Sequence, residues 1–285
     1  MTKVLVLGGG FIGSHLVLEL IKSNYDVTIF QRSKPKKNLS KVKSKSVDLT
    51  DPINTLKKIK NFDYVINCAG KLNGNNQKNL FITNLKIFVY SYFACILNNI
   101  KNYVFISSNN VVSDTYFLEK VKKKYKIKNG YTLAKIFSEF IASELLKNND
   151  ISLKIIRPSN VYGLEKKNGA IHYIFNKIKN TNKKIVKLNL NPNILRNYTH
   201  VEDCASCIVK LLKIPKNIIC NITNDKKISL KKIVEICLKT HNKKIKIKYN
   251  FKQKKTDKSF KINNLKKYLF WKDRYNIKSG IESFL

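Results

Sequence analysis

Glycine is scarce in this sequence, with ten in 285 residues. Four of the ten fall between positions 8 and 13, after an apolar run at residues 4–7 and before an amphipathic helical pattern. That context is the one that the G-x-G-x-x-G motif requires. Gly8 permits the tight turn, Gly10 lets the backbone approach a pyrophosphate, and Gly13 lets the helix lie close on the sheet. The stretch therefore predicts a dinucleotide-binding turn, with Phe11 and Ile12 beside Gly13 in the cofactor-binding segment.

Acidic residues are also few: 18 stand against 56 basic ones, a net charge of +38. Such an excess of basic residues indicates either that the protein binds a polyanion such as nucleic acid or that its composition is biased towards lysine. The lysine runs at 34–37, 121–128 and 243–249 are scattered along the chain and interrupted by apolar residues. This pattern favours the bias, with salt-sensitive, nonspecific DNA binding but no specific nucleic-acid partner.

Only four of the basic residues are arginines. Where lysine is the default, an arginine suggests a site that needs a planar, forked donor. Arg32 follows the second predicted strand, Arg157 opens an R-P-S-N segment, and Arg196 opens R-N-Y-T-H. These three are the candidates for charged ligand contacts.

The sequence shows no secretory signal and no uninterrupted apolar stretch long enough to span a bilayer, so we expect a cytoplasmic protein without a membrane partner. The six cysteines are expected to be reduced and buried. The C-x-x-C at 204–207 lies inside a helical pattern without a second pair, and the four histidines share no metal-ligand spacing. We therefore expect neither a metal nor a redox site.

Strand and helix patterns alternate without hairpin signals from residue 4 to about 158, which predicts an α/β, Rossmann-type, doubly wound parallel sheet. We assign residues 1–158 to an NAD(P)-binding domain, to which 199–223 return. Residues 159–198 and 224–285 form a smaller, discontinuous substrate-binding lobe. The active site is expected in the cleft between them.

Further cofactor contacts are expected where the strands end. An acid after the second strand would select NAD through the ribose 2′-hydroxyl, and an arginine would accommodate the 2′-phosphate of NADP. Gln31 and Arg32 stand there, so the choice between NAD and NADP remains open. The other predicted contacts at strand ends are Asp48, Leu49, Cys68, Ala69 and Gly70.

Ser108 ends the fifth predicted strand, and the helical pattern at 129–145 carries Tyr131 and Lys135 four residues apart, on one face. An ammonium beside a phenol favours the phenolate, so we expect the pKa of Tyr131 to be lowered from about 10. Tyr131 is therefore a candidate general base.

The ordered segments GGGFIGSHL (8–16), FISSNNV (105–111), YTLAK (131–135), RPSNVYG (157–163) and RNYTHVED (196–203) resemble those of the NAD-dependent epimerase/dehydratase family, within the extended short-chain dehydrogenases/reductases. The resemblance covers essentially the whole chain. It implies that Ser108, Tyr131 and Lys135 are catalytic, and that Lys135 also binds the nicotinamide ribose. It further implies that Pro158 lies by the nicotinamide, that Ser108, Asn160 and Arg196 contact a nucleoside-diphosphate sugar, and that the protein is a homodimer.

One absence narrows the reaction. Dehydratases of this family carry an acid pair after the catalytic Ser or Thr, whereas Asn109 and Asn110 follow Ser108 here. The resemblance thus favours a nucleotide-sugar 4-epimerase. The alternative is an NADPH-dependent 4-ketoreductase acting on an NDP-4-keto sugar, and a noncatalytic basic Rossmann protein that binds nucleic acid is a third hypothesis, disfavoured by the Ser-Tyr-Lys set.

Overall fold

The computed structural model describes residues 1–111, 129–166, 168–224, 226–251, 269 and 271–285. The chain divides into two compact units: Met1–Pro158 with Ala205–Asn221, and Ser159–Cys204 with Ile222–Leu285. Residues 199–204 and 222–223, which we had assigned to the dinucleotide-binding domain, therefore belong to the smaller unit. The contacts of Asp203 explain part of this difference, because its carboxylate accepts hydrogen bonds from the backbone N–H groups of Arg274 and Tyr275.

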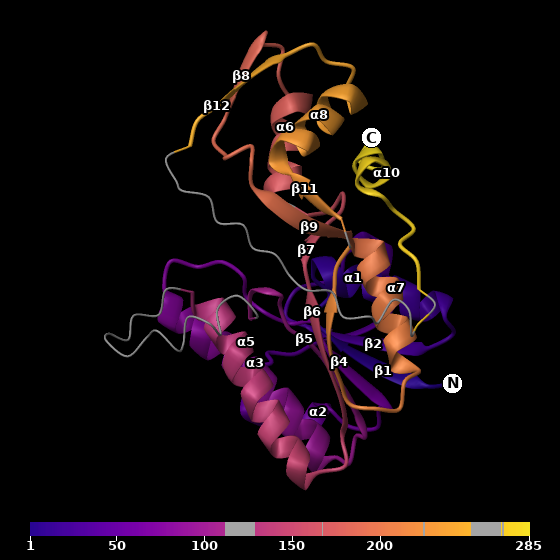
Figure 1. The fold of residues 1–285 in the computed structure, drawn as a ribbon. Coiled ribbons are helices and arrows are strands. Elements are labelled where there is room, and N and C mark those ends of the chain that lie inside the picture. The colour runs from indigo at the N-terminus through magenta and orange to yellow at the C-terminus, as the bar shows by residue number, and fades with distance from the viewer. Residues whose placement is uncertain (112–128, 167, 225, 252–268, 270) are drawn as a thin grey trace. The chain divides into compact units, whose positions relative to one another are not determined.

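A seven-stranded sheet forms the centre of the first unit, in the order β3-β2-β1-β4-β5-β6-β10 (Figure 1). Its pairs from β3 through to β6 are parallel. This arrangement confirms the predicted doubly wound α/β fold. Strand order reverses beside β1, whose neighbours are β2 and β4, and ligands of such sheets bind at that point, beyond the carboxyl ends of the strands. The strands are β1 (Lys3–Leu7), β2 (Asp26–Gln31), β3 (Lys43–Ser46), β4 (Tyr64–Asn67), β5 (Asn102–Ile106), β6 (Ser152–Pro158) and β10 (Ile218–Ile222).

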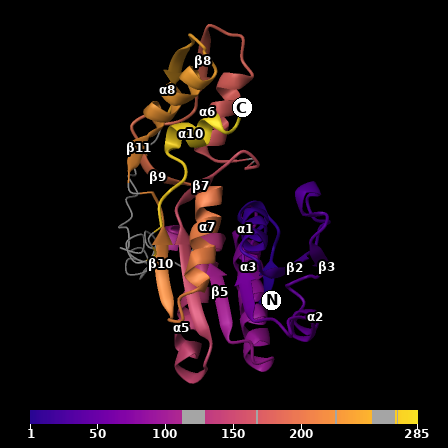
Figure 2. The same cartoon turned by 90° about the vertical axis from the view of Figure 1, so that its right-hand side faces the viewer.

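Helices cover both faces of this sheet (Figures 1 and 2). Helices α2, α3 and α5 lie on one face, and α1 and α7 lie on the other. A continuous apolar core joins the strands to the α2–α3–α5 layer, with Leu5, Phe88 and Tyr103 completely buried. The helices are α1 (Phe11–Lys22), α2 (Pro52–Lys58), α3 (Gln77–Leu97), α5 (Gly130–Leu145) and α7 (Val201–Leu212), with short 3₁₀ segments η1 (Lys37–Leu39) and η2 (Leu146–Asn148).

Helix α3 is long and apolar enough to cross a membrane by length and composition, although Asn84 and Lys86 interrupt its apolar run. Its apolar character has a structural explanation: Leu80, Phe88, Tyr92 and Cys95 are buried in the unit's interior. A helix buried in a protein core can have the same length and apolar composition, so α3 is weak evidence for a membrane span.

The second unit is smaller and has a core of its own. Helix α6 places its buried side chains three or four residues apart, which presents one apolar stripe to the unit's interior. It packs on α8, and both helices contribute to the same apolar cluster. A three-stranded sheet (β11-β9-β7) and a two-stranded sheet (β12-β8) complete the unit. Its elements are β7 (Asn160–Tyr162), α6 (Ala170–Lys179), β8 (Ile185–Leu188), β9 (Leu195–His200), β11 (Lys227–Ser229), α8 (Leu230–Thr240), β12 (Lys246–Tyr249) and α10 (Ile277–Glu282).

Candidate functional site

The glycine turn between β1 and α1 has the geometry that a pyrophosphate needs. Gly8 has a φ of 89° and donates its N–H to the Phe30 carbonyl at 2.8 Å. A Cβ on Gly13 would lie 1.9 Å from the Gly8 oxygen, whereas a Cβ on Gly10 would meet nothing within 4 Å. Gly10 is the N-cap of α1, so this open space adjoins the N–H groups of the first turn of the helix. The turn therefore fits the phosphates of a dinucleotide.

A cavity of about 500 Å³ opens at this turn, along the carboxyl ends of β1, β2 and β4. The structure brings nine of the predicted cofactor residues together on its wall. Phe11, Ile12 and Gly13 form the first turn of α1 and are not among the lining residues. The nine are Gly8, Gly10, Gln31, Arg32, Asp48, Leu49, Cys68, Ala69 and Gly70.

Gln31 supports the glycine turn itself, because its Oε1 accepts a hydrogen bond from the Gly9 N–H at 3.0 Å. The cavity wall beyond it is cationic: Arg32, Lys34, Lys36 and Lys71 line it. Lys34 and Lys36 belong to the lysine run at 34–37, which we had interpreted as compositional bias, and Lys71 was not singled out in the sequence.

Asp48 is the one acid among the described residues that line this cavity. Its pKa is lowered, mainly by hydrogen bonds from the backbone N–H and hydroxyl of Thr50 and further by the charge of Arg32. The carboxylate is therefore ionised at neutral pH and available as an acceptor.

Tyr131 is positioned by the start of α5. Asn129 caps this helix by accepting from the Thr132 N–H, and the Gly130 N–H donates to the Gln77 side chain on α3. A Cβ on Gly130 would lie 1.9 Å from the Gln77 carbonyl oxygen, so only glycine lets the two helices start this close. The Tyr131 ring then lies against the cavity wall, since a Cβ on Gly70 would be 3.8 Å from the Tyr131 Cε2.

Asn84, on α3, holds the wall segment in place. Its Oδ1 accepts from the Lys71 N–H at 2.9 Å, and its Nδ2 donates to the Lys71 carbonyl at 3.0 Å. This buried amide fixes the backbone that follows Gly70, and its signal in the sequence is a polar residue on the buried side of an apolar helix.

Lys135 is 4% exposed, and its Nζ donates to the Ile106 carbonyl at the end of β5 at 2.8 Å. The same Nζ lies 4.3 Å from the Phe105 ring centroid and 5.6 Å from that of Tyr131. Burial lowers the pKa of Lys135 to about 8, while Cys68 and Glu139 act in the opposite direction. Lys135 therefore carries a charge at neutral pH but loses it in mildly alkaline solution.

The prediction for the pKa of Tyr131 was wrong. Burial raises that pKa to about 12. No hydrogen bond between the Lys135 ammonium and the Tyr131 hydroxyl is present in the described part of the chain; Lys135 donates to a carbonyl and lies near aromatic rings. Desolvation of the phenolate therefore outweighs the attraction of the nearby cation.

Ser108 lies just beyond β5, and its Oγ accepts a hydrogen bond from the Asn110 N–H. The Asn109 N–H donates to the Pro158 carbonyl at the end of β6 at 3.2 Å. Ser108, Pro158 and the Lys135 ammonium thus all lie at the carboxyl ends of β5 and β6, on the first unit.

Asn160 and Arg196 lie on the second unit, on the adjacent strands β7 and β9. Together with Lys166, His172 and Tyr198 they line a cavity of about 180 Å³, with no acidic residue among the described residues of its wall. The Asn160 amide donates to the Asn197 carbonyl. The cavity shares Asn168, Gly169 and His172 with a wider hollow of about 1150 Å³. The guanidinium, ammonium and amide donors of the smaller cavity suit a phosphorylated ligand.

All six cysteines are free thiols, and Cys204 and Cys207 are buried in α7. Within the described ranges, no group of three or more His, Cys, Asp or Glu side chains lies together as metal ligands would. Burial raises the pKa values of the Cys68 and Cys220 thiols to about 12, so neither is a ready nucleophile.

The glycine turn lies at the switch point, and Tyr131 lies against the wall of the same cavity, with Lys135 four residues further along α5. Together they define a class: an NAD(P)-dependent enzyme built on a Rossmann-type domain. Comparison with known proteins makes the assignment specific. The model of the NAD dependent epimerase/dehydratase family matches residues 4–223, and the chain belongs to this family.

Individual relatives are more distant. The chain is 28% identical over 253 residues, 82% of its length and 80% of the relative's, to a Methanocaldococcus jannaschii protein with the provisional name UDP-glucose 4-epimerase. A UDP-N-acetylglucosamine 4-epimerase from Methanobrevibacter ruminantium, solved with UDP-N-acetylmuramic acid, has a TM-score of 0.83 at 21% identity, covering 99% of this chain and 96% of that one. The UDP-glucose 4-epimerase of Thermus thermophilus, solved with NAD, has a TM-score of 0.78 at 18% identity, covering 99% of each chain.

Proposed function

We propose that this protein is a cytosolic nucleotide-sugar 4-epimerase that keeps a nicotinamide cofactor in the glycine-turn cavity. The observation that carries the proposal is the place of Tyr131 beside Gly70 on the wall of that cavity, with the Lys135 ammonium 5.6 Å from the Tyr131 ring centroid. The provisional name of the Methanocaldococcus jannaschii relative and the titles of the similar structures support the choice of 4-epimerase.

In the proposed reaction each residue has a separate role. When bound, the nicotinamide supplies reversible hydride transfer at the sugar C4. Tyr131 takes the proton of the C4 hydroxyl and returns it, and Ser108 hydrogen-bonds the same oxygen. Because the pKa of Tyr131 is about 12, its phenolate needs the positive charge of Lys135 at the moment of proton transfer. We therefore expect catalysis to fall as Lys135 loses its proton, near pH 8.

The second unit would hold the rest of the substrate. Arg196, Lys166 and His172 supply donors for the diphosphate around the smaller cavity. The adjoining hollow of about 1150 Å³ provides the volume for a nucleoside. Asn160 contributes an amide to the same wall.

A second candidate, an NADPH-dependent 4-ketoreductase, is favoured by the cations of the cofactor cavity. Arg32, Lys34 and Lys36 follow β2, where the adenosine ribose of a bound dinucleotide lies in this fold. A 2′-phosphate would add two negative charges beside them. The reductase would use external NADPH and release its oxidised form.

The deciding experiment is to denature the purified protein and identify the released nucleotide by mass. Stoichiometric NAD favours the epimerase. An empty protein that binds NADPH at least tenfold more tightly than NADH favours the reductase, and binding of neither dinucleotide refutes both. Tyr131→Phe should abolish conversion of UDP-glucose or UDP-N-acetylglucosamine while leaving dinucleotide affinity within about twofold, with Tyr90→Phe on α3 as the matched control.

We also propose a homodimer formed through α3 and α5. These helices expose apolar side chains to solvent, with Phe140 63% and Leu97 66% exposed. A second copy of the same surface is the simplest partner for such a patch, because an isologous pair covers both copies at once. Light scattering should show a dimer that Phe140→Asp dissociates and that Ile53→Asp, on the exposed side of α2, leaves intact.

A further inference from the structure

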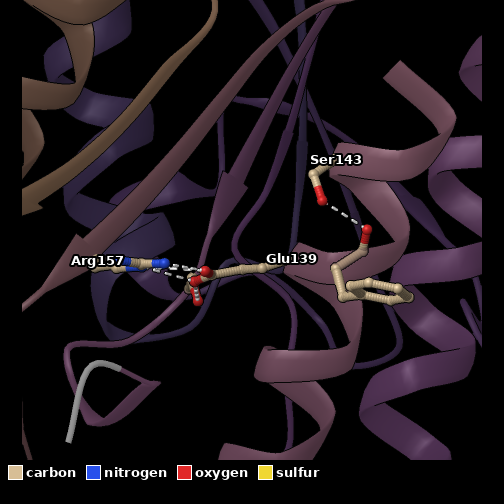
Figure 3. A network of polar contacts seen from close by, with 5 residues as sticks. Glu139, Ser143 and Arg157 are labelled. Carbon is tan, nitrogen blue, oxygen red and sulfur yellow. Dashed lines mark hydrogen bonds and ion pairs between the residues drawn. The ribbon is translucent and has the colours of Figure 1, made fainter. Parts of the chain in front are cut away.

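Helix α5 carries a third titratable residue at the same four-residue spacing as Tyr131 and Lys135. Glu139 follows Lys135 by four residues and is 7% exposed. Its carboxylate accepts a hydrogen bond from the Ser107 hydroxyl. The Nε of Arg157 lies 3.0 and 3.1 Å from its two oxygens, and Nη2 of the same guanidinium also donates to it. Figure 3 shows the Arg157 guanidinium facing the Glu139 carboxylate. Ser143, which lies on the same helix as Glu139, is separate from this ion pair.

These contacts join three elements directly beside Ser108. Arg157 belongs to β6, Glu139 to α5, and Ser107 follows β5. The backbone strengthens the connection, because the Ser107 N–H donates to the Ile156 carbonyl at 2.7 Å.

Ser108 is thus held from both sides. On one side the Ser107 hydroxyl is bound to Glu139, and on the other the Asn109 N–H is bound to the Pro158 carbonyl. One residue further back, the Ile106 carbonyl accepts from Lys135. Segment 106–109 is therefore bonded to two side chains of α5, those of Lys135 and Glu139. It is also bonded to two backbone carbonyls of β6.

Stability alone is a weak explanation for this arrangement. A buried ion pair loses so much hydration that apolar residues of the same size often serve stability equally well. Ser107 is also only 3% exposed, so its hydroxyl needs a partner inside the protein. The partner that it has is Glu139, and the bond lies next to the serine that has to meet the substrate oxygen.

We propose that Glu139 and Arg157 are positioning residues: through the Ser107 hydroxyl they fix Ser108 relative to Tyr131 and Lys135. This inference rests on the proposed function in taking those three residues as the catalytic set. Glu139 and Arg157 do not touch substrate in this account. They act on catalysis through the residue beside Ser108.

Glu139 has a second effect, on the charge of Lys135. The groups that face the Lys135 ammonium are Tyr131 and Glu139 on its own helix, the Cys68 thiol at the end of β4, and the Ile106 carbonyl on β5. Glu139 is the one carboxylate among these groups. Removing its charge should make the Lys135 ammonium easier to deprotonate.

The first test is Ser107→Ala, which removes one hydroxyl and leaves the Glu139–Arg157 pair in place. A displacement of Ser108 should lower kcat by roughly 10- to 100-fold, since a misplacement of about 1 Å costs on the order of 100-fold. The KM for the nucleotide sugar and the affinity for the dinucleotide should stay within about twofold. Ser143→Ala is the matched control on α5, because that hydroxyl bonds only the Phe140 carbonyl of its own helix among the described contacts.

The second test compares Glu139→Gln with Glu139→Asp. The Gln variant keeps the shape and loses the charge, so the alkaline limb of the kcat–pH profile should move to lower pH. The Asp variant keeps the charge and should leave that limb in place while lowering kcat. Glu144→Gln, at an exposed position on the same helix, controls for charge removal in general.

All rates are measured at least 15 °C below each variant's melting temperature, so that a simple loss of stability leaves kcat unchanged. If Tyr131→Phe is inactive but Ser107→Ala has the kcat of the unaltered protein, the positioning role is wrong and the proposed function stands. A Gln variant with an unmoved alkaline limb contradicts the effect on Lys135. If Tyr131→Phe remains active, the catalytic set itself is wrong.

Discussion

Two glycines of the same turn should respond in opposite ways to a single added methyl group. In Gly13→Ala the new Cβ would lie 1.9 Å from the Gly8 carbonyl oxygen. Ordinary contact begins near 3.4 Å, so the helix and the turn would have to separate by about 1.5 Å. Both partners are backbone, and Gly8 is held by its hydrogen bond to Phe30, so no side chain can give way.

The cost for Gly13→Ala exceeds that of ordinary overpacking, which is about 1–3 kcal/mol. We expect a loss of at least about 3 kcal/mol in the free energy of unfolding, or roughly 6–12 °C in melting temperature. In Gly10→Ala the methyl group enters open space, and the φ of −67° at Gly10 suits an L-residue. Its melting temperature should change by less than about 3 °C, because a changed N-cap and a stiffer unfolded chain partly offset each other.

Dinucleotide binding separates the two variants further. The Gly10 methyl group occupies the space beside the first-turn N–H groups of α1, so the affinity for the dinucleotide should fall by at least about tenfold although the fold is intact. Thermal unfolding gives the stability difference, and isothermal titration with NAD and NADPH gives the affinity. A Gly13→Ala protein that melts within 2 °C of the unaltered protein would refute the close-approach argument, and a Gly10→Ala protein with unchanged affinity would refute the phosphate site.

Three further changes test other parts of the structure. Arg196→Lys should raise the KM for the nucleotide sugar by about tenfold with kcat nearly unchanged, because an ammonium cannot make the forked contact; equal losses in kcat and kcat/KM would contradict a binding role. Burial raises the pKa of Asp203 to about 6 from 3.8, so the folded state binds this proton more tightly and the associated stability is lost as the pH rises from about 4 to 6. The melting temperature of the unaltered protein, relative to that of Asp203→Asn, should therefore fall across that range. A relative melting temperature that rises with pH would show that the fold favours the carboxylate. Gly130→Ala should destabilise α5 against α3 and reduce kcat, since its Cβ would lie 1.9 Å from the Gln77 oxygen; proton-transfer rates equal to those of the unaltered protein would show that Tyr131 is positioned by other contacts.

The sequence was most informative where a local pattern has one backbone solution. The apolar run and the glycine cluster predicted β1, its turn and α1, because few residues other than glycine can occupy the left-handed conformation of Gly8 or the contact at Gly13. Alternation of strands and helices was sufficient for the doubly wound sheet. Unit boundaries were less predictable, since they depend on contacts between distant residues: Asp203 is bonded to residues more than 70 positions away in the second unit.

Charge and burial were harder to predict than fold. Tyr131 and Lys135 share a helix face, but the direction in which the pKa of Tyr131 shifts depends on how deeply the phenol is buried and on which group Lys135 contacts. Glu139 was missed because an acid on a helix usually faces solvent, and the residues next to it in the sequence do not indicate a contact with β6. Arg157 had been singled out because arginines are rare here, and its forked contact with Glu139 is of the kind that rarity suggested.

The division of the chain into interleaved segments has a consequence for its synthesis. The last strand of the seven-stranded sheet, β10, lies about sixty residues after β6, its neighbour, and the first half of the second unit is made in between. Until the ribosome has released residues 218–222, β6 is an open edge with unpaired backbone groups. Truncated products that end before β10 should therefore associate with one another through that edge.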